Sequence, residues 1–275
     1  MSNYKIGIQG VKGSNHYLVA KEYFGDQNEI QEFLTFDDLV DSLTNEKSDF
    51  GIMAIENSIA GSIIPNYALI DKNNLQIVGE YYLNIHHHLM ALPNQNIEDI
   101  KEVVSHPMAL LQCKDYLRDV GHLKLVEDVD TAEVAQRISK NQLKGIAAIA
   151  PKIAAELYDL EILADDIQTI KNNSTRFVIV QRHSYVSLQQ KVNKASLKFM
   201  LDHKRGSLAT VLNVMSDCKL NLTKIQSLPK IETPWKYAFF VDVTYEEKKD
   251  YEKAIAILQI MAEDFKILGE YTKGR

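Results

Sequence analysis

The sequence predicts an α/β protein in two parts, and three observations support this prediction. Up to about residue 180, short apolar runs alternate with segments of helical spacing, which is typical of parallel sheets covered by helices on both faces. A polar, weakly patterned stretch at residues 184–194 then predicts a linker. Beyond it, the order strand, helix, strand, strand, helix, strand predicts a ferredoxin-like βαββαβ domain over residues 195–275.

The elements of the first part follow from its alternating pattern. Pro107 and Pro151 indicate helix starts, since proline suits the first turn, and Asp130 with Glu133 predicts an N-cap and its capping-box partner. Because ligands bind beyond the carboxyl ends of parallel strands, the rim is expected at 10–14, 56–62, 105–106 and 150–152. The predicted elements are strand 4–10, helix 16–24, strand 29–36, helix 36–43, strand 50–55, strand 75–85, strand 102–106, helix 107–117, strand 123–128, helix 130–138, strand 145–150 and helix 151–158.

The second part has its own order of elements. Leu208, Val211, Leu212 and Met215 form a helical stripe, and the run at 235–245 is apolar on both faces, which indicates a central strand. The predicted elements are strand 195–203, helix 206–217, strand 221–231 (weakened at Pro229), strand 235–245, helix 251–261 and strand 265–271.

Composition excludes several classes of function. The chain of 275 residues is 45% hydrophobic and 25% charged, as in soluble globular proteins, and carries a net charge of −6. An acidic chain without a basic block is not expected to bind nucleic acid or an anionic membrane. The sequence shows neither a signal peptide nor a run of about 18 apolar residues, so we expect a cytoplasmic protein. Cys113 and Cys218 are expected to be buried thiols rather than a disulfide or a zinc site.

Three rim segments carry polar side chains. Glu56, Asn57 and Ser58 directly follow the strand at 50–55, and Gly61 would let the backbone approach a ligand. Alternatively, Asn57 or Ser58 caps a following helix. The glycine turn at 10–16 lacks a phosphate-loop motif, so it predicts a tight turn first and an anion site second. Ser105 is a candidate cap for the helix that Pro107 opens, and Gln112 reaches the rim only if that helix faces the cleft.

The stretch Asn172–Phe177 leads into a further strand. Arg176 offers a planar fork that matches a carboxylate, and Asn173, Ser174 and Thr175 crowd it. Alone, such an arginine is more often a salt-bridge partner. His86 and His88 share a face of a strand, but no cysteine or carboxylate pattern completes a metal site.

Taken in order, these segments resemble prephenate dehydratase followed by an ACT regulatory domain. The motifs are GVKGS at 10–14, ENSIAG at 56–61, SHPMALLQC at 105–113 and STRF at 174–177. In the last part they are GSL at 206–208, NLT at 221–223 and FFVDV at 239–243. The resemblance covers nearly the whole chain and rests on the ordered set, since each tripeptide alone is weak.

The resemblance implies a two-lobed catalytic domain like periplasmic binding proteins, at residues 1–183. Lobe one is expected at about 1–82 plus 175–183, and lobe two at about 83–170. The family converts prephenate to phenylpyruvate on the route to phenylalanine, without a metal or organic cofactor. Its ACT domains usually pair, so a homodimer or homotetramer is expected.

The resemblance also implies roles for individual residues. Thr175 corresponds to the catalytic threonine that acts on the leaving hydroxyl, and Glu56 is a candidate proton source behind it. Arg176 is expected to hold the side-chain carboxylate of prephenate, and Phe177 to wall the cleft. The other substrate-binding candidates are Asn57, Ser58, Gly61, Ser105, Gln112, Asn173 and Ser174.

In the ACT domain, the resemblance implies feedback by L-phenylalanine. The candidate regulatory residues are Gly206, Ser207, Leu208, Asn221, Leu222 and Gln226. The family's ESRP element reads QSLP here, with Gln226 and Leu228 in place of its glutamate and arginine. Other departures are Val11, Asn15, His16 and Met108. Arogenate is an alternative substrate, and a non-catalytic amino-acid or dicarboxylate sensor is an alternative function.

Overall fold

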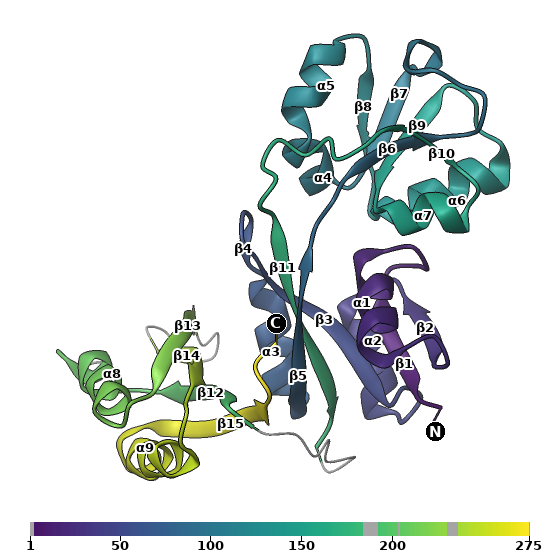
Figure 1. Cartoon of the computed structure of the whole chain (residues 1–275). Coiled ribbons are helices and arrows are strands. Elements are labelled where there is room, and N and C mark those ends of the chain that lie inside the picture. Colours follow the sequence, from purple (N-terminus) through teal and green to yellow (C-terminus); the bar gives the residue numbers. More distant parts are fainter. Residues whose placement is uncertain (1–2, 184–191, 203, 230–235, 275) are drawn as a thin grey trace. The chain divides into compact units, whose positions relative to one another are not determined.

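The computed structural model describes residues 3–183, 192–202, 204–229 and 236–274, which form three sheets (Figure 1). The predicted fold class is confirmed: two α/β lobes precede a ferredoxin-like βαββαβ domain. The chain passes between the sheets of the two lobes twice, at residues 85–87 and at 165–173. The two crossings contact each other, since the Ile167 N–H donates to the His87 carbonyl at 2.8 Å.

The first sheet has the order β2-β1-β3-β11-β5, and β4 pairs with β3. β1 pairs with β2 and β3 in parallel, and its residues Ile6 and Ile8 are fully buried. The elements are β1 (Lys5–Gln9), α1 (Asn15–Phe24), β2 (Glu29–Phe33), α2 (Phe36–Thr44), β3 (Phe50–Asn57), β4 (Gly61–Ser62), α3 (Ile64–Lys72), β5 (Leu75–Asn84) and β11 (Ser174–Arg182).

The second sheet has the order β10-β6-β9-β7-β8 and is mixed. β7 is parallel to β8 and β9, whereas β6 and β10 are antiparallel additions at one edge that the sequence pattern did not predict. The elements are β6 (His88–Ala91), the 3₁₀ turn η1 (Ile97–Asp99), β7 (Glu102–Ser105), α4 (Pro107–Gln112), α5 (Lys114–Val120), β8 (Lys124–Glu127), α6 (Thr131–Asn141), β9 (Ile146–Ala150), α7 (Lys152–Leu157) and β10 (Glu161–Ala164).

The predicted helix starts and ends were partly confirmed. Asp130 caps α6 and accepts a hydrogen bond from the Glu133 N–H at 2.8 Å, as predicted. The predicted single helix at 107–117 is wrong: it is broken at Cys113, because the Gln112 carbonyl accepts from the Thr169 N–H at 2.8 Å. Cys113 and Cys218 are both free and buried.

Two predicted caps are also wrong. His106, not Ser105, is the N-cap of α4, and its ring accepts from the Met108 N–H at 3.2 Å. The helix α3 begins only at Ile64, so neither Asn57 nor Ser58 caps it.

The ferredoxin-like domain has the sheet order β13-β14-β12-β15, so the apolar strand β14 is central, as predicted. One face of the sheet packs on α8 and α9 through Leu197, Phe199, Val211 and Leu258. The elements are β12 (Lys194–Met200), α8 (Ser207–Asp217), β13 (Asn221–Pro229), β14 (Tyr237–Thr244), α9 (Lys248–Met261) and β15 (Glu263–Tyr271).

The described chain forms two compact units, Met1–Gly61 with Tyr82–Phe177 and Ser62–Tyr81 with Val178–Arg275. The predicted domain boundaries stay predictions, and residues 184–191 of the predicted linker lie outside the described residues. No helix within the described ranges has the length and apolarity needed to cross a bilayer.

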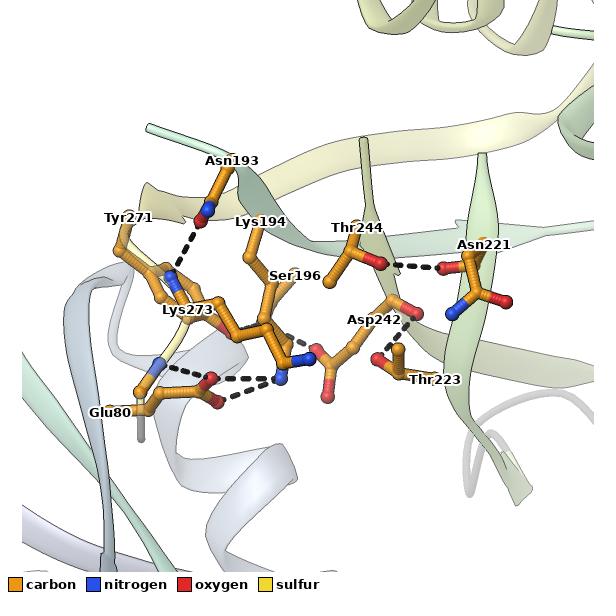
Figure 2. A network of polar contacts seen from close by, with 11 residues as sticks. Glu80, Asn193, Lys194, Ser196, Asn221, Thr223, Asp242, Thr244, Tyr271 and Lys273 are labelled. Carbon is orange, nitrogen blue, oxygen red and sulfur yellow. Dashed lines mark hydrogen bonds and ion pairs between the residues drawn. The ribbon is translucent and has the colours of Figure 1, made fainter. Parts of the chain in front are cut away.

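The second unit contains a buried polar network (Figure 2). Lys194 of β12 forms an ion pair with Glu80 of β5 at 2.8 Å, and the two side chains are 2% and 0% exposed. On the same face of β12, Ser196 donates to Asp242 at 2.5 Å. This face of the sheet is therefore covered, and the Lys194–Glu80 pair is one of the contacts that join β5 to it.

Candidate active site

The side chain of Asn57 fixes the turn that follows β3. Its Oδ1 accepts from the backbone N–H groups of Ile59 at 2.9 Å and Ala60 at 2.8 Å. A backbone N–H only donates, so these contacts establish which end of the amide is oxygen. The Nδ2 group must then donate, and it does so to Asn173 Oδ1 at 2.7 Å and Thr175 Oγ1 at 2.9 Å.

The same donor direction continues along a chain of amides. Because Asn173 Oδ1 accepts from Asn57, its Nδ2 is the donor to Gln112 Oε1 at 2.9 Å. Gln112 Oε1 also lies 2.8 Å from the Nε2 atom of His87. An acceptor oxygen requires a proton on that nitrogen. The five side chains of Asn57, His87, Gln112, Asn173 and Thr175 are called the amide cluster below.

The amide cluster leaves two donors unused. Thr175 Oγ1 accepts from Asn57, so its own O–H proton is left for another acceptor, and none is found within the described part of the chain. The Nε2 group of Gln112 likewise has no acceptor among the described residues. Two hydrogen-bond donors with fixed orientation suit a ligand rich in oxygen.

Backbone contacts hold the cluster in place. Ser58 and Ser174 exchange two hydrogen bonds, Ser58 N to Ser174 O at 2.8 Å and Ser174 N to Ser58 Oγ at 2.9 Å. The Asn173 carbonyl accepts from the Ile85 N–H at 2.7 Å. Asn173 is only 1% exposed and both ends of its amide are used, so it links the cluster. Gln112 faces this region, which the prediction had made conditional on the direction of its helix.

Other predicted site residues lie outside the amide cluster. Arg176 follows Thr175 in β11, and successive strand residues point to opposite faces. Arg176 is 5% exposed, so its guanidinium group is buried on the face of β11 opposite to Thr175. Glu56 precedes Asn57 in β3 and is half-buried. Gly61 has a φ of +85°, which explains a glycine there, but a Cβ at this position would meet nothing.

Phe177 and Ser105 are packed into the interior. The ring of Phe177 meets the ring of His16 edge-on at 5.0 Å. Burial lowers the pKa of His16 to about 4, so His16 packs as a neutral aromatic ring. Ser105 is fully buried, and its hydroxyl donates to the Ile149 carbonyl at 2.7 Å, which joins β7 to β9.

The glycines of the turn at residues 10–16 allow neighbouring segments to pack closely against it. A Cβ on Gly13 would lie 3.1 Å from the Cα of Ala154, and the Tyr158 hydroxyl donates to the Lys12 carbonyl at 2.5 Å. A Cβ on Gly10 would lie 2.8 Å from Asp130 Oδ2. A carboxylate beside the turn disfavours an anion there, which supports the tight-turn interpretation.

A cavity of about 490 Å³ lies on the opposite side of the first crossing. It is lined by Asn84, His86 and His88, whereas Ile85 and His87 of the same segment bond to the amide cluster or its backbone. His86 pairs with Asp166 at 2.6 Å and His88 with Asp165 at 3.1 Å. Among the described residues, no three potential ligands converge as a metal site requires. None of the predicted substrate-binding residues lines this cavity.

The ferredoxin-like domain holds a second pocket, of about 150 Å³. Of the predicted regulatory residues, Ser207 and Leu208 line it, beside Asp202, Lys204 and Phe239. Gly206 is the N-cap of α8 and makes no side-chain cap. Asn221 and Leu222 begin β13, and the Gln226 amide donates to the Ser227 carbonyl at 2.9 Å; these three do not line the pocket.

His87 is the cluster member that the sequence interpretation missed. The sequence pattern favours surface or core histidines over a metal site for the run at 86–88 and assigns His87 no role. A signal was present, since residues of an extended segment alternate in direction and His87 must point away from His86 and His88. What it points to is decided by the fold.

Comparisons with known proteins agree with the motif resemblance. The family model described as prephenate dehydratase matches residues 6–185. Arogenate dehydratase/prephenate dehydratase 2, chloroplastic, of Arabidopsis thaliana is 33% identical over 280 residues, which cover 98% of this chain and 73% of that protein. Prephenate dehydratase from Staphylococcus aureus has a TM-score of 0.84 at 26% identity, covering 98% of this chain and 100% of that one. A structure described as a novel type of quorum quenching acylase has a TM-score of 0.87 at 26% identity, covering 97% of each chain.

Proposed function

The chain belongs to the prephenate dehydratase family, and we propose that it converts prephenate to phenylpyruvate in the synthesis of L-phenylalanine. The observation that carries this proposal is the Thr175 hydroxyl, whose oxygen accepts from Asn57 at 2.9 Å and whose proton is left for a ligand. In the reaction, the bond between the ring and its carboxylate breaks and releases CO₂. Its electron pair completes the aromatic ring as the ring C–O bond breaks, and one proton converts the departing hydroxyl to water.

Thr175 has the chemistry to assist the leaving hydroxyl. A donor that acts on charge that develops in the transition state accelerates the step more than one that binds substrate equally well. The pKa of a threonine hydroxyl is far too high for Thr175 to supply the proton by itself, so it acts as a donor or relay. Glu56 is our candidate for the proton source, since it is adjacent to Asn57 in β3.

Arg176 is proposed to bind the side-chain carboxylate of the substrate, and this role requires rearrangement of a buried side chain. The Gln112 amide is proposed to donate to an oxygen of the substrate. Ser58, Ser174 and Asn173 are proposed to act through their backbone and amide contacts, which hold the donors in place. Ser105, being fully buried, is proposed only to hold β7 against β9.

The direct experiment is an assay of the purified chain with prephenate and, separately, with arogenate. We expect an aromatic product that absorbs in the ultraviolet from at least prephenate, and the ratio of kcat/KM decides the preferred acid. Absence of turnover with both acids would overturn the proposal. Acyl transfer is not proposed, because it requires a nucleophile beside a base, and His87 in the cluster is bonded to an amide.

The orientation of the amide cluster is testable at Asn57. Asn57→Asp removes the donor to Thr175 and places a negative charge beside a dianionic substrate. We expect kcat/KM to fall roughly 10- to 100-fold, since misplaced groups carry penalties of this size. Asn73→Asp, on the helix end of α3, is the matched control and should retain turnover. Wild-type kinetics in Asn57→Asp would show that the donor direction is irrelevant.

We also propose that the ferredoxin-like domain is an ACT domain whose effector is L-phenylalanine. The pocket offers both charges that an amino-acid zwitterion needs, in Asp202 and Lys204, which pair with each other at 2.5 Å. Leu208 and Phe239 supply apolar surface for a ring, and the uncapped N–H groups of α8 suit a carboxylate. The substitutions at Gln226 and Leu228 do not line this pocket.

Calorimetry tests the effector. L-Phenylalanine is expected to bind at or below millimolar concentration and to reduce turnover, while L-alanine, which has the same charges but no ring, should do neither. Asp202→Asn should weaken binding of L-phenylalanine. If millimolar L-phenylalanine neither binds nor inhibits, the domain has another role.

We also propose that the chain forms a homodimer or homotetramer in the cytoplasm. β13 is an edge strand of its sheet, and unpaired edges favour pairing with a second copy. Light scattering of the purified chain measures the oligomeric state directly.

A further inference from the structure

His87 occupies a fixed and unusual position. Its backbone N–H donates to Gln168 Oε1 at 3.0 Å, and its carbonyl accepts from the Ile167 N–H at 2.8 Å. The residue is 4% exposed. The Ile167 backbone and the Gln168 side chain of the second crossing therefore hold His87 where its Nε2 lies 2.8 Å from Gln112 Oε1.

The hydrogen-bond directions define the tautomer of His87. Backbone N–H groups fix which end of the Asn57 amide is oxygen, and the Asn57 N–H₂ group fixes the orientation of Asn173 in the same way. The Asn173 N–H₂ group then makes Gln112 Oε1 an acceptor. His87 must then carry its proton on Nε2. Burial is the largest effect on its pKa and lowers it below the ordinary value, so the ring is neutral at pH 7 and Nδ1 is unprotonated.

This tautomer leaves a buried acceptor unsatisfied. Nδ1 of His87 is buried and has no hydrogen-bond partner among the residues that the structure describes. A leucine or phenylalanine would fill such a position without the penalty of an unpaired polar atom. The histidine is therefore explained by the one contact it makes, through Nε2, and not by packing.

We propose that His87 is a positioning residue for the reaction: together with Asn173 it holds Gln112 Oε1 and so directs the Gln112 N–H₂ group toward the substrate. Without these two donors the amide is free to rotate, and its oxygen would then face an oxygen-rich dianion. The proposal rests on the proposed dehydratase function, because it assigns Gln112 a substrate to act on. His87 itself touches no reacting atom.

A double-mutant cycle separates positioning from a structural role. His87→Leu is expected to lower kcat/KM for prephenate roughly 30-fold in the wild-type background, in the range found for misplaced catalytic groups. In the Gln112→Ala background the same substitution should change kcat/KM less than about 3-fold. His87→Gln, which retains a donor, should recover most of the activity. Equal losses in the two backgrounds would overturn the proposal, as would a failure of His87→Gln to exceed His87→Leu.

A second measurement needs no turnover and covers the case in which His87→Leu does not fold. Long-range ¹H–¹⁵N spectra of the wild-type protein, assigned by the signal lost in His87→Gln, should show a neutral ring with its proton on Nε2 at pH 7 to 8. A charged ring or a proton on Nδ1 alone would overturn the proposal. Wild-type protein that shows the expected tautomer but turns over neither prephenate nor arogenate would reject the function. In that outcome the hydrogen bonds of the amide cluster are confirmed. The positioning role of His87 is rejected, because Gln112 then has no prephenate to act on.

Discussion

Thr175→Ala is expected to lower kcat for prephenate by about 100- to 1,000-fold while KM changes little, because the lost donor acts on charge that develops as the hydroxyl leaves. The hydroxyl is positioned for this: its oxygen accepts from Asn57 at 2.9 Å, and its proton is left for a ligand. Thr175 is 8% exposed, and alanine removes little packing. The fold should therefore persist, as circular dichroism and thermal unfolding would show.

Thr175→Ser is the matched control for this result. Serine keeps the hydroxyl and loses only a methyl group, so it should retain most of the turnover. The Thr175→Val variant keeps the shape and removes the hydroxyl, and should behave as Thr175→Ala does. If Thr175→Ala or Thr175→Val turns over prephenate at close to the wild-type rate, Thr175 has no part in the chemistry.

Glu80→Leu is expected to lower the free energy of unfolding by about 3–5 kcal/mol, the usual effect of removing one partner from a buried ion pair. Lys194 would remain 2% exposed without the carboxylate that pairs with it at 2.8 Å (Figure 2). The Gly274 N–H would lose the Glu80 oxygen that it contacts at 2.9 Å. Urea unfolding of the purified variant gives the measurement.

Two variants make this stability test specific. Glu80→Leu combined with Lys194→Met should recover most of the loss, since replacing both partners with apolar groups is often neutral. Glu102→Leu removes the exposed pair with Lys124, which is 69% exposed, and should change stability by less than about 1 kcal/mol. Equal effects of Glu80→Leu and Glu102→Leu would show that the Lys194–Glu80 pair contributes no more than a surface contact.

Local patterns gave most of the fold. Alternation of apolar runs with helical stripes predicted the α/β class of the first part, the resemblance implied its two lobes, and the βαββαβ order was confirmed in full. The strands β6 and β10 were missed, because each has only four residues and joins the sheet as an antiparallel addition at one edge. β12 shows the limit of periodicity: Lys194, Ser196 and Lys198 alternate with apolar residues as on a half-exposed strand, yet both faces are buried.

The candidate site was predictable in part. Asn57, Gln112, Asn173 and Thr175 each lie at the end of a strand or short helix, and their motifs resembled a family that the comparisons then showed. The contacts among them join residues 116 and 118 positions apart, which no local pattern can encode. The placement of Ser105 in the interior and of Arg176 on the opposite face of β11 also required the structure.

By itself, the sequence determined the family and the α/β class and provided the candidate site residues, because these depend on residue type and short-range order. Only the tertiary structure decided which of those groups donate and which accept. Two backbone N–H groups of the turn after β3 fix Asn57, and each amide then fixes the next, as far as His87 on the first crossing. Hydrogen-bond direction is a property of contacts between distant segments, so it emerges only when the chain has folded.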